Sequence, residues 1–243
     1  MRTRRDPGTP AFLVTCEHGG NRVPAAWREL FTGHEALLAS HRGWDPGALS
    51  IARALARRLD APAIVSTTTR LLVDLNRSPG NPRVFSELTR PLAIATRRTL
   101  LARHHAPHHA RVVATIEGLL ERHERVVHLG VHSFTPVLEG RVRAIDVALL
   151  YDPARPLERR FADRWLAALA ALRPDLRLRR NAPYAGVADG LTTLLRRRFP
   201  ARRYLGIELE VSQRLAPEDR AVRRALVESI GAVAASAERS ATR

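Results

Sequence analysis

The sequence predicts a single-domain, three-layer α/β/α fold with a mixed, mostly parallel sheet. Short β-branched or apolar runs alternate along the chain with longer segments of helical spacing, which is typical of an α/β protein. No internal repeat or low-complexity linker divides the 243 residues, and 45% of them are apolar, so the chain is long enough to bury a sizeable core. We therefore expect one domain over residues 1–243, with residues 1–10 as a flexible N-terminal tail.

The strands are expected where short apolar or β-branched runs occur between polar segments. In chain order these runs are Ala11–Thr15, Ala63–Thr67, Leu71–Asp74, Val126–Ser133, Asp146–Tyr151, Leu176–Arg179 and Leu205–Val211. The helices are expected where apolar residues recur every three or four positions. These segments are Gly47–Leu59, Leu88–His105 leading into Arg111–Arg122, Leu157–Leu172, Thr192–Arg198 and Glu218–Arg239. Pro107 should interrupt the second of them, because proline lacks the N–H that an internal helical bond needs.

The formal net charge of +16 raises the question of a nucleic-acid partner. All 40 basic residues are arginine, and alanine and leucine are abundant, which indicates a compositional bias rather than a selected phosphate-binding surface. Aromatic residues make up only 5% of the chain and offer little stacking surface for single strands. The arginine clusters are therefore expected to be solvated faces, and nucleic acid is not the expected partner.

The single cysteine, Cys16, excludes a disulfide within the chain and favours a reducing, cytoplasmic compartment. No apolar stretch is long enough for a transmembrane helix, and the first residues lack the apolar core of a secretory signal. A nucleophilic role for Cys16 is conceivable beside Glu17 and a histidine base. Its position at the end of a buried strand favours plain packing instead.

Polar residues follow several of the predicted strands, where ligands bind in sheets of this kind. His18 comes after the first strand, Asn76 and Arg77 come after the third, and His132 lies near the end of the fourth. Glu208 and Glu210 lie two residues apart on the last strand, and hence on one face of it. Side chains from separate segments are thereby expected to meet at one edge of the sheet.

His18 and His132 are the candidate metal ligands, because neutral imidazole binds zinc well and a catalytic zinc site needs only three protein ligands. A carboxylate can supply the third ligand, and Asp45 in the segment GWDPGAL is the candidate. Its alternative role is an N-cap of the helix that follows. Asn21 is a substitute third ligand, although amides bind zinc weakly.

Hydrolysis at such a site needs a proton acceptor and an anchor for the substrate. Glu208 or Glu210 can serve as the base. Both lie in the apolar run GIELEV, where a buried carboxylate is costly without a partner, so a metal ion or an arginine is expected next to them. Arg77, next to Asn76, offers the planar fork that binds a carboxylate through two hydrogen bonds, with a surface salt bridge as its alternative role.

Four histidines at positions 104, 105, 108 and 109 have the i,i+4 spacing of a helical metal site. No glutamate lies between the two pairs, and Pro107 falls inside the cluster. We interpret the cluster as the edge of a helix from which one member, His109, reaches the substrate site.

Six segments of the chain resemble, in order, the motifs of the N-formylglutamate amidohydrolase family, and more distantly those of the zinc carboxypeptidases. They are Thr15–Pro24 (TCEHGGNRVP), Val73–Pro79 (VDLNRSP), Pro107–His109 (PHH), Val131–Phe134 (VHSF), Asn181–Gly190 (NAPYAGVADG) and Gly206–Gln213 (GIELEVSQ). The resemblance runs from residue 11 to about residue 215 and implies a zinc carboxypeptidase-like (phosphorylase/hydrolase-like) fold.

The resemblance also implies roles for single residues. His18 and His132 would be metal ligands, Asn76 and Arg77 would bind the substrate carboxylate, and Glu210 would be the base, with Glu208 as the fallback. Tyr184 matches a position that can cover the substrate. The carboxypeptidases have a glutamate three residues after their first histidine, where this chain has Asn21, and Asp45 takes its place as third ligand.

The sequence therefore predicts a hydrolase that uses zinc or another divalent metal ion to cleave the linear amide of a small, acidic N-acyl amino acid. N-formylglutamate, giving formate and glutamate, is the first candidate substrate. A zinc carboxypeptidase-like peptidase is the second enzymatic hypothesis. From a different class of protein, the alternative is a non-catalytic, arginine-rich nucleic-acid-binding protein on the same fold.

Overall fold

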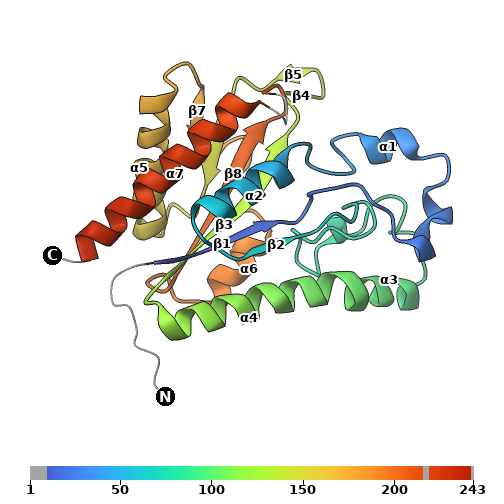
Figure 1. The fold of residues 1–243 in the computed structure, drawn as a ribbon. Helices are drawn as coiled ribbons and strands as arrows, with labels where there is room; N and C mark the ends of the chain where they lie inside the picture. Colours follow the sequence, from blue (N-terminus) through green and yellow to red (C-terminus); the bar gives the residue numbers. More distant parts are fainter. Residues whose placement is uncertain (1–9, 216–218, 242–243) are drawn as a thin grey trace.

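The computed structural model describes residues 10–215 and 219–241, so the predicted tail at residues 1–10 lies outside the described residues except for Pro10. Its central element is a six-stranded sheet of order β2-β1-β3-β8-β6-β7 (Figure 1). The strands are β1 (Ala11–Cys16), β2 (Ala63–Val65), β3 (Val126–Phe134), β6 (Val147–Leu150), β7 (Leu178–Arg180) and β8 (Tyr204–Ser212). All neighbours are parallel except β6 and β8, which are antiparallel. This arrangement confirms the predicted mixed, mostly parallel sheet.

Helices cover both faces of the sheet and complete the three layers (Figure 1). On one face, α2 (Ala48–Arg58), α5 (Pro156–Leu172) and α7 (Arg220–Ala241) enclose the larger apolar cluster. On the other face, α4 (Ala106–Arg122) and α6 (Leu191–Arg198) enclose a smaller one. Strand β3 is buried along its whole length, as expected for a strand covered on both sides.

The face beneath α4 and α6 turns polar toward the carboxyl ends of the strands. Because side chains alternate along a strand, Val127, Leu129 and Val131 face the larger cluster while His128 and His132 face the other side. In the parallel register His132 pairs with Glu210. The second face thus presents histidine and glutamate side chains side by side where the sheet ends.

The predicted strand Leu71–Asp74 is not a strand. Its residues form turns, and Leu71, Leu72 and Val73 are buried in a third apolar cluster together with Phe31 and Leu100. A short apolar run is buried equally well in a packed loop or in a strand, so its periodicity does not distinguish the two. The other predicted strands are present, with ends within two residues of the predicted ones.

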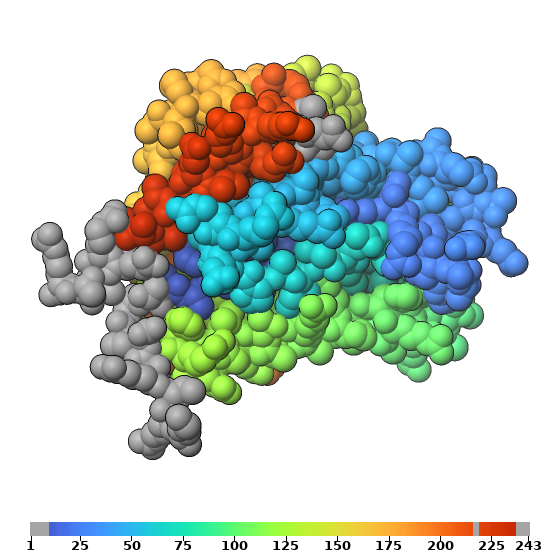
Figure 2. Space-filling view, viewed as in Figure 1, coloured from blue at the N-terminus to red at the C-terminus, as the bar shows by residue number. Residues whose placement is uncertain are grey.

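Pro107 does not interrupt the helical stretch, contrary to the sequence prediction. Helix α3 (Ile94–Leu100) continues through a π-helical turn, η4 (Leu101–His105), directly into α4. Pro107 lies in the first turn of α4, where its missing N–H costs little. Figure 2 shows this stretch as a continuous band along one edge of the molecule. The stretch starts at Ile94 rather than at Leu88, after Pro91.

Shorter elements complete the described chain. They are η1 (Ala25–Trp27), η2 (Glu29–Phe31), α1 (Glu35–Ala39), η3 (Pro82–Val84) and a small hairpin of β4 (Val137–Leu138) and β5 (Arg141–Val142). The hairpin belongs to the connection between β3 and β6. None of the described helices has the length and apolar character that crossing a membrane requires.

Candidate metal centre and substrate cavity

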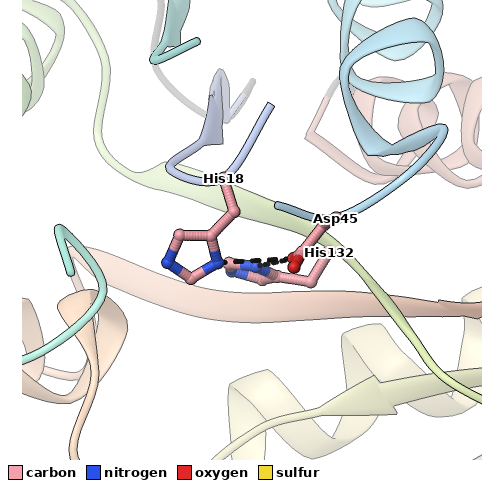
Figure 3. Close-up of side chains that lie close together, drawn as sticks. All are labelled: His18, Asp45 and His132. Carbon is pink, nitrogen blue, oxygen red and sulfur yellow. Dashed lines mark hydrogen bonds and ion pairs between the residues drawn. The ribbon is translucent and has the colours of Figure 1, made fainter. Parts of the chain in front are cut away.

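His18, Asp45 and His132 converge at the carboxyl end of the sheet (Figure 3). The Nδ1 atoms of both histidines face Asp45 Oδ2, at 3.4 Å for His18 and 3.0 Å for His132. All three side chains are buried, and their candidate ligand atoms lie within 4.8 Å of one another. Within the described part of the chain this is the one group of three such residues that could hold a metal ion.

The backbone brings these residues together from three segments. His18 follows β1, His132 lies on β3, and Asp45 precedes α2. The amide of Asp45 donates to the carbonyl of His18 at 2.9 Å, which joins the two loops directly. The alternative role of Asp45 as an N-cap is wrong: Gly47, in the left-handed region at φ 83°, caps α2, and Asp45 turns its carboxylate toward the histidines.

The outer nitrogen of each histidine faces a second buried carboxylate. His18 Nε2 lies 2.7 Å from Asp74 Oδ1, and His132 Nε2 lies 3.3 Å from Glu17 Oε2. Carboxylates in this position fix the orientation of metal-binding imidazoles and raise their basicity. Asp74 and Glu17 were assigned no role from the sequence, although Glu17 lies within the motif TCEHGGNRVP and Asp74 within VDLNRSP.

The carboxylates of the centre are held in their ionised form. Burial raises their pKa values, but the histidines around them and the guanidinium of Arg70 outweigh burial, so the pKa values of Asp45 and Asp74 lie below the ordinary range. Arg70 contacts both of them, at 3.3 Å from Asp45 Oδ1 and 2.7 Å from Asp74 Oδ2. Metal binding needs such deprotonated ligands.

Glu210 differs from the other carboxylates of the centre. The residue is 5% exposed, and Oε2 has no hydrogen-bond partner among residues 10–215 and 219–236. Burial, with the charges of Asp45 and Glu208, raises its pKa to about 8. Glu208 is already engaged, because its Oε1 accepts a hydrogen bond of 2.6 Å from Thr192. Of the two predicted candidates for the base, Glu210 is the one with a buried oxygen that no described residue bonds.

These residues fit a divalent metal ion. Two imidazoles and a carboxylate form the donor set of many catalytic zinc sites, and the buried, unpartnered oxygen of Glu210 lies in the same cavity. An uncompensated carboxylate in an apolar setting is costly, and a nearby cation would offset that cost. The orphaned oxygen thus supports the reading of this centre as a cation site.

The centre opens into a cavity of about 160 Å³. Besides the residues already described, Asn76, Arg77, Tyr184, Ala188 and Asp189 line it. Asn76 accepts a hydrogen bond from the amide of Leu191 at 2.7 Å, and its Nδ2 lies 3.4 Å from His132 Nε2. Arg77 donates one hydrogen bond to the carbonyl of Asp189 at 2.6 Å. The predicted anchor and cover residues, Arg77 and Tyr184, thus lie in the same cavity as the metal centre.

His109 does not line this cavity, contrary to the sequence prediction. Its Nε2 donates to the carbonyl of Leu75, and His105 Nε2 donates to the carbonyl of Arg77, each at 2.8 Å. The two rings stack with centroids 4.0 Å apart, one helical turn from each other. This pair therefore supports the loop that carries Asn76 and Arg77.

The neighbouring member of the cluster, His108, contacts Glu17, the buried carboxylate behind His132. Its Nε2 lies 3.6 Å from Glu17 Oε1, whereas His132 contacts the other oxygen of Glu17. The four-histidine motif thus contributes supporting contacts.

The substitute third ligand, Asn21, does not line the cavity: its exposed side chain donates to the carbonyl of Leu38 at 3.1 Å.

Comparison with known proteins identifies relatives over most of the chain. The family model "N-formylglutamate amidohydrolase" matches residues 10–216. A gene product of Agrobacterium tumefaciens of known structure is 26% identical, with a TM-score of 0.75 over 98% of this chain and 93% of that one. The N-formylglutamate amidohydrolase of Ralstonia eutropha JMP134 is 19% identical, with a TM-score of 0.72 over 98% and 97% of the two chains, and is similar in fold. No curated protein matches this chain.

Proposed function

Because the chain belongs to the N-formylglutamate amidohydrolase family, whose members are hydrolases acting on linear amides, we propose that it is a metal-dependent hydrolase of N-acyl amino acids. N-formylglutamate, cleaved to formate and glutamate, is the first candidate substrate. The supporting observation is the shared cavity: the His18–Asp45–His132 group, the unpartnered oxygen of Glu210 and the guanidinium of Arg77 all line it.

His18, Asp45 and His132 would hold zinc or another divalent ion. When bound, that ion acidifies water and polarises the amide carbonyl. Asp74 and Glu17 hold the outer nitrogens of the two histidines and thereby orient their rings. Arg70 contacts Asp45 and Asp74, so it fixes the ligand carboxylate as well.

Glu210 is suited to move the proton. Its free Oε2 accepts a proton from the attacking water and returns it to the amide nitrogen as the carbon–nitrogen bond breaks. The new carbon–oxygen bond yields the carboxylic acid, and the protonated nitrogen leaves as the amine. A carboxyl group with a pKa of about 8 lies close to neutral pH, where a group can both accept and donate a proton.

Arg77 is suited to hold the substrate carboxylate. Its NH1 group donates to the carbonyl of Asp189, its Nε lies 4.0 Å from Asp74 Oδ2, and the residue lines the cavity. A guanidinium presents paired donors that match a carboxylate. The cavity volume of about 160 Å³ favours a small molecule over a peptide segment, since drug-sized ligands occupy about 300 Å³ or more.

Metal loading and hydrolysis test the proposal together. Purified full-length protein is stripped of metal, reloaded with zinc and assayed with a panel of N-formyl and N-acetyl amino acids and with dipeptides. We expect stoichiometric zinc binding and zinc-dependent release of formate from N-formylglutamate. His132→Ala should lose both, while His123→Ala, a change outside the cavity, should keep both.

The outcomes separate the hypotheses. Wild-type protein that binds no stoichiometric divalent metal excludes the metal-dependent mechanism. Zinc-dependent cleavage of dipeptides but not of N-acyl amino acids indicates the peptidase. Tight DNA or RNA binding above about 0.2 M salt, with no hydrolysis, would instead support the nucleic-acid-binding alternative.

A further inference from the structure

Arg143 stands out beside the cavity because its guanidinium is enclosed by two aromatic rings. The guanidinium carbon lies 5.2 Å from the centroid of Tyr184 and 5.9 Å from that of Phe134. Its NH1 group donates to the Tyr184 hydroxyl at 3.2 Å and lies 3.4 Å from the carbonyl of Thr135. Tyr184 lines the cavity, so Arg143 lies directly behind a cavity wall at its edge.

The backbone fixes Arg143 in this place. It follows β5, and its amide donates to the carbonyl of Pro136 at 2.8 Å across the hairpin. A guanidinium stacked between rings loses little further freedom when it binds a ligand, and its outer edge keeps its donors. The residue is thus pre-oriented by contacts that leave most of its N–H groups unused.

Arg143 has no carboxylate partner among residues 10–215 and 219–236. The two arginines that line the cavity have partners: Arg70 contacts both Asp45 and Asp74, whereas Arg77 donates one hydrogen bond to Asp189 and keeps donors for a single carboxylate. The edge of the cavity near Arg143 is cationic, because desolvation and then the charges of Arg42, Arg143 and Arg70 lower the pKa of the exposed His41. An anionic group of a ligand would therefore be stabilised there.

The cavity consequently has one carboxylate position inside it, at Arg77, and a second at its edge, where Arg143 lies behind Tyr184. Arg77 NH1 donates to Asp189 and its Nε lies 4.0 Å from Asp74 Oδ2, so its remaining donors suffice for a single carboxylate. A substrate with two carboxylates needs a second cation, and Arg70 cannot provide it without giving up Asp45 or Asp74. Arg143 is the guanidinium beside the cavity whose donors remain available.

We propose that Arg143 is a specificity-determining residue that binds the second carboxylate of an N-acyl dicarboxylic amino acid. This inference rests on the proposed function and extends it, because it assigns the preference for a glutamate-like over a glutamine-like substrate to one side chain. Tyr184 positions Arg143 through its ring and its hydroxyl group.

The test compares N-formyl-L-glutamate with N-formyl-L-glutamine, which differ by one charge at nearly constant shape. The quantity of interest is the ratio of kcat/KM for the two substrates. In Arg143→Met, whose side chain fills the space between the rings without a charge, we expect this ratio to fall about tenfold or more, mainly through the KM of the glutamate compound. Arg143→Lys should restore part of the ratio.

Arg141→Gln is the matched control, because Arg141 is exposed on β5 of the same hairpin and its loss changes the net charge equally. Its ratio should equal that of the wild type. A wild-type ratio near unity, or an unchanged ratio in Arg143→Met, overturns the proposal. A loss in Arg141→Gln as large as that in Arg143→Met also overturns it, since general electrostatic steering would then explain the effect.

Binding measurements separate this inference from the proposed function. If zinc-loaded wild type hydrolyses neither compound, the proposed function fails, and equilibrium binding of glutarate and butyrate tests the second anchor alone. Glutarate should then bind more tightly than butyrate to the wild type, and Arg143→Met should remove the difference. Equal binding of the two acids to the wild type contradicts a second carboxylate site.

Discussion

At the scale of single residues, burial and chemistry oppose each other most directly at Glu210. The carboxyl group is buried beside Asp45 and Glu208 and has an oxygen without a hydrogen-bond partner among the described residues. A group in this setting is costly to keep ionised, which is the reason that its pKa rises to about 8. The same setting makes it an effective proton acceptor and donor near neutral pH.

Glu210→Gln should therefore separate activity from stability. We expect activity to fall by about 10² to 10⁴-fold while zinc still binds. An acid with a raised folded pKa loses stability as pH rises from its unfolded value of about 4.3 toward about 8. The metal-free variant should accordingly melt higher than metal-free wild type, by a margin that grows between pH 5 and pH 8. A variant that melts lower across this range would show that the carboxylate has a structural role instead.

Asp74 acts on the centre through His18. The bond of 2.7 Å between Asp74 Oδ1 and His18 Nε2 orients the ring, so Asp74→Asn should weaken zinc binding by about 10 to 100-fold. Competition with a chelator of known affinity measures this change. Asp189→Asn is the control, since Asp189 lines the same cavity but bonds to Ser78 and Asn81. Equal losses in both variants would exclude a specific role for Asp74.

At the scale of elements, a buried ion pair fixes the loop in front of α6. Arg196 Nε lies 3.1 Å from Glu158 Oε2, and its NH1 and NH2 groups donate to the carbonyls of Gly186 and Gly206. Gly186 is needed in this loop, because a Cβ there would lie 2.2 Å from the backbone of Tyr151. The wall of the cavity formed by Tyr184 to Asp189 is thus anchored from beneath.

Arg196→Met should destabilise the fold by about 3 kcal/mol, because it breaks a buried ion pair and leaves Glu158 with only the longer contact to Arg155 NH1, at 3.7 Å. Urea unfolding measures the loss, and the KM of the variant should rise as the loop loses its anchor at Gly186. Arg197→Met, an exposed change one residue away, should have little effect on either. The double variant with Glu158→Gln should recover part of the stability, and an additive double variant would contradict the coupling.

The elements also show where sequence reasoning succeeds and where it fails. Strands buried on both faces, such as β3 and β8, are predicted nearly to their ends, because β-branched and apolar residues fill them. The segment Leu71–Asp74 has the same composition but is buried by a local cluster without strand partners. The predicted interruption at Pro107 is wrong because a π-helical turn precedes this residue and places it in the first turn of α4, where proline is tolerated.

The site repeats this pattern. The residues that were predicted from sequence motifs line the cavity: His18, His132, Asn76, Arg77, Glu208 and Glu210. Asp74, Glu17 and Arg70 were missed, because their importance depends on which buried groups they face across the fold. His109 and Asn21 were placed at the cavity by their spacing in the sequence, but their side chains hold loops elsewhere.

At the scale of the whole molecule, the arginines serve as partners for buried acids as well as solvated surface. Asp146, whose side chain is 2% exposed, lies at the start of β6 and bonds to Arg177 before β7 and to Arg214 after β8. The contact joins three strands at the edge of the sheet. Part of the formal charge of +16 is therefore distributed over contacts that hold the fold together.

This contact makes the free energy of unfolding depend on pH in the acid range. Burial opposes ionisation of Asp146, but the hydrogen bonds from Arg177 and Arg214 outweigh it and hold its pKa well below the ordinary range. Its contribution is complete above the unfolded pKa of about 3.9 and is lost as pH falls toward the folded value. Asp146→Asn should cost about 2 kcal/mol at pH 7, and its gap from wild type should narrow below about pH 5. A gap that stays constant from pH 7 to pH 3 would contradict this assignment.

The reversed direction of β6 affects which part of the sequence can diverge during evolution. Because β6 is antiparallel to β8, the chain leaves β3 and re-enters the sheet at the same end, where Gln213 and Ser212 bond to Phe134 and Asp146. No crossover helix is required there, so residues 135–145 form a surface insert with exposed Val137 and Val142 rather than a core element. Mutations accumulate in such an insert without a packing penalty. Substrate preference can therefore diverge among descendants of this chain while His18, Asp45 and His132 are retained.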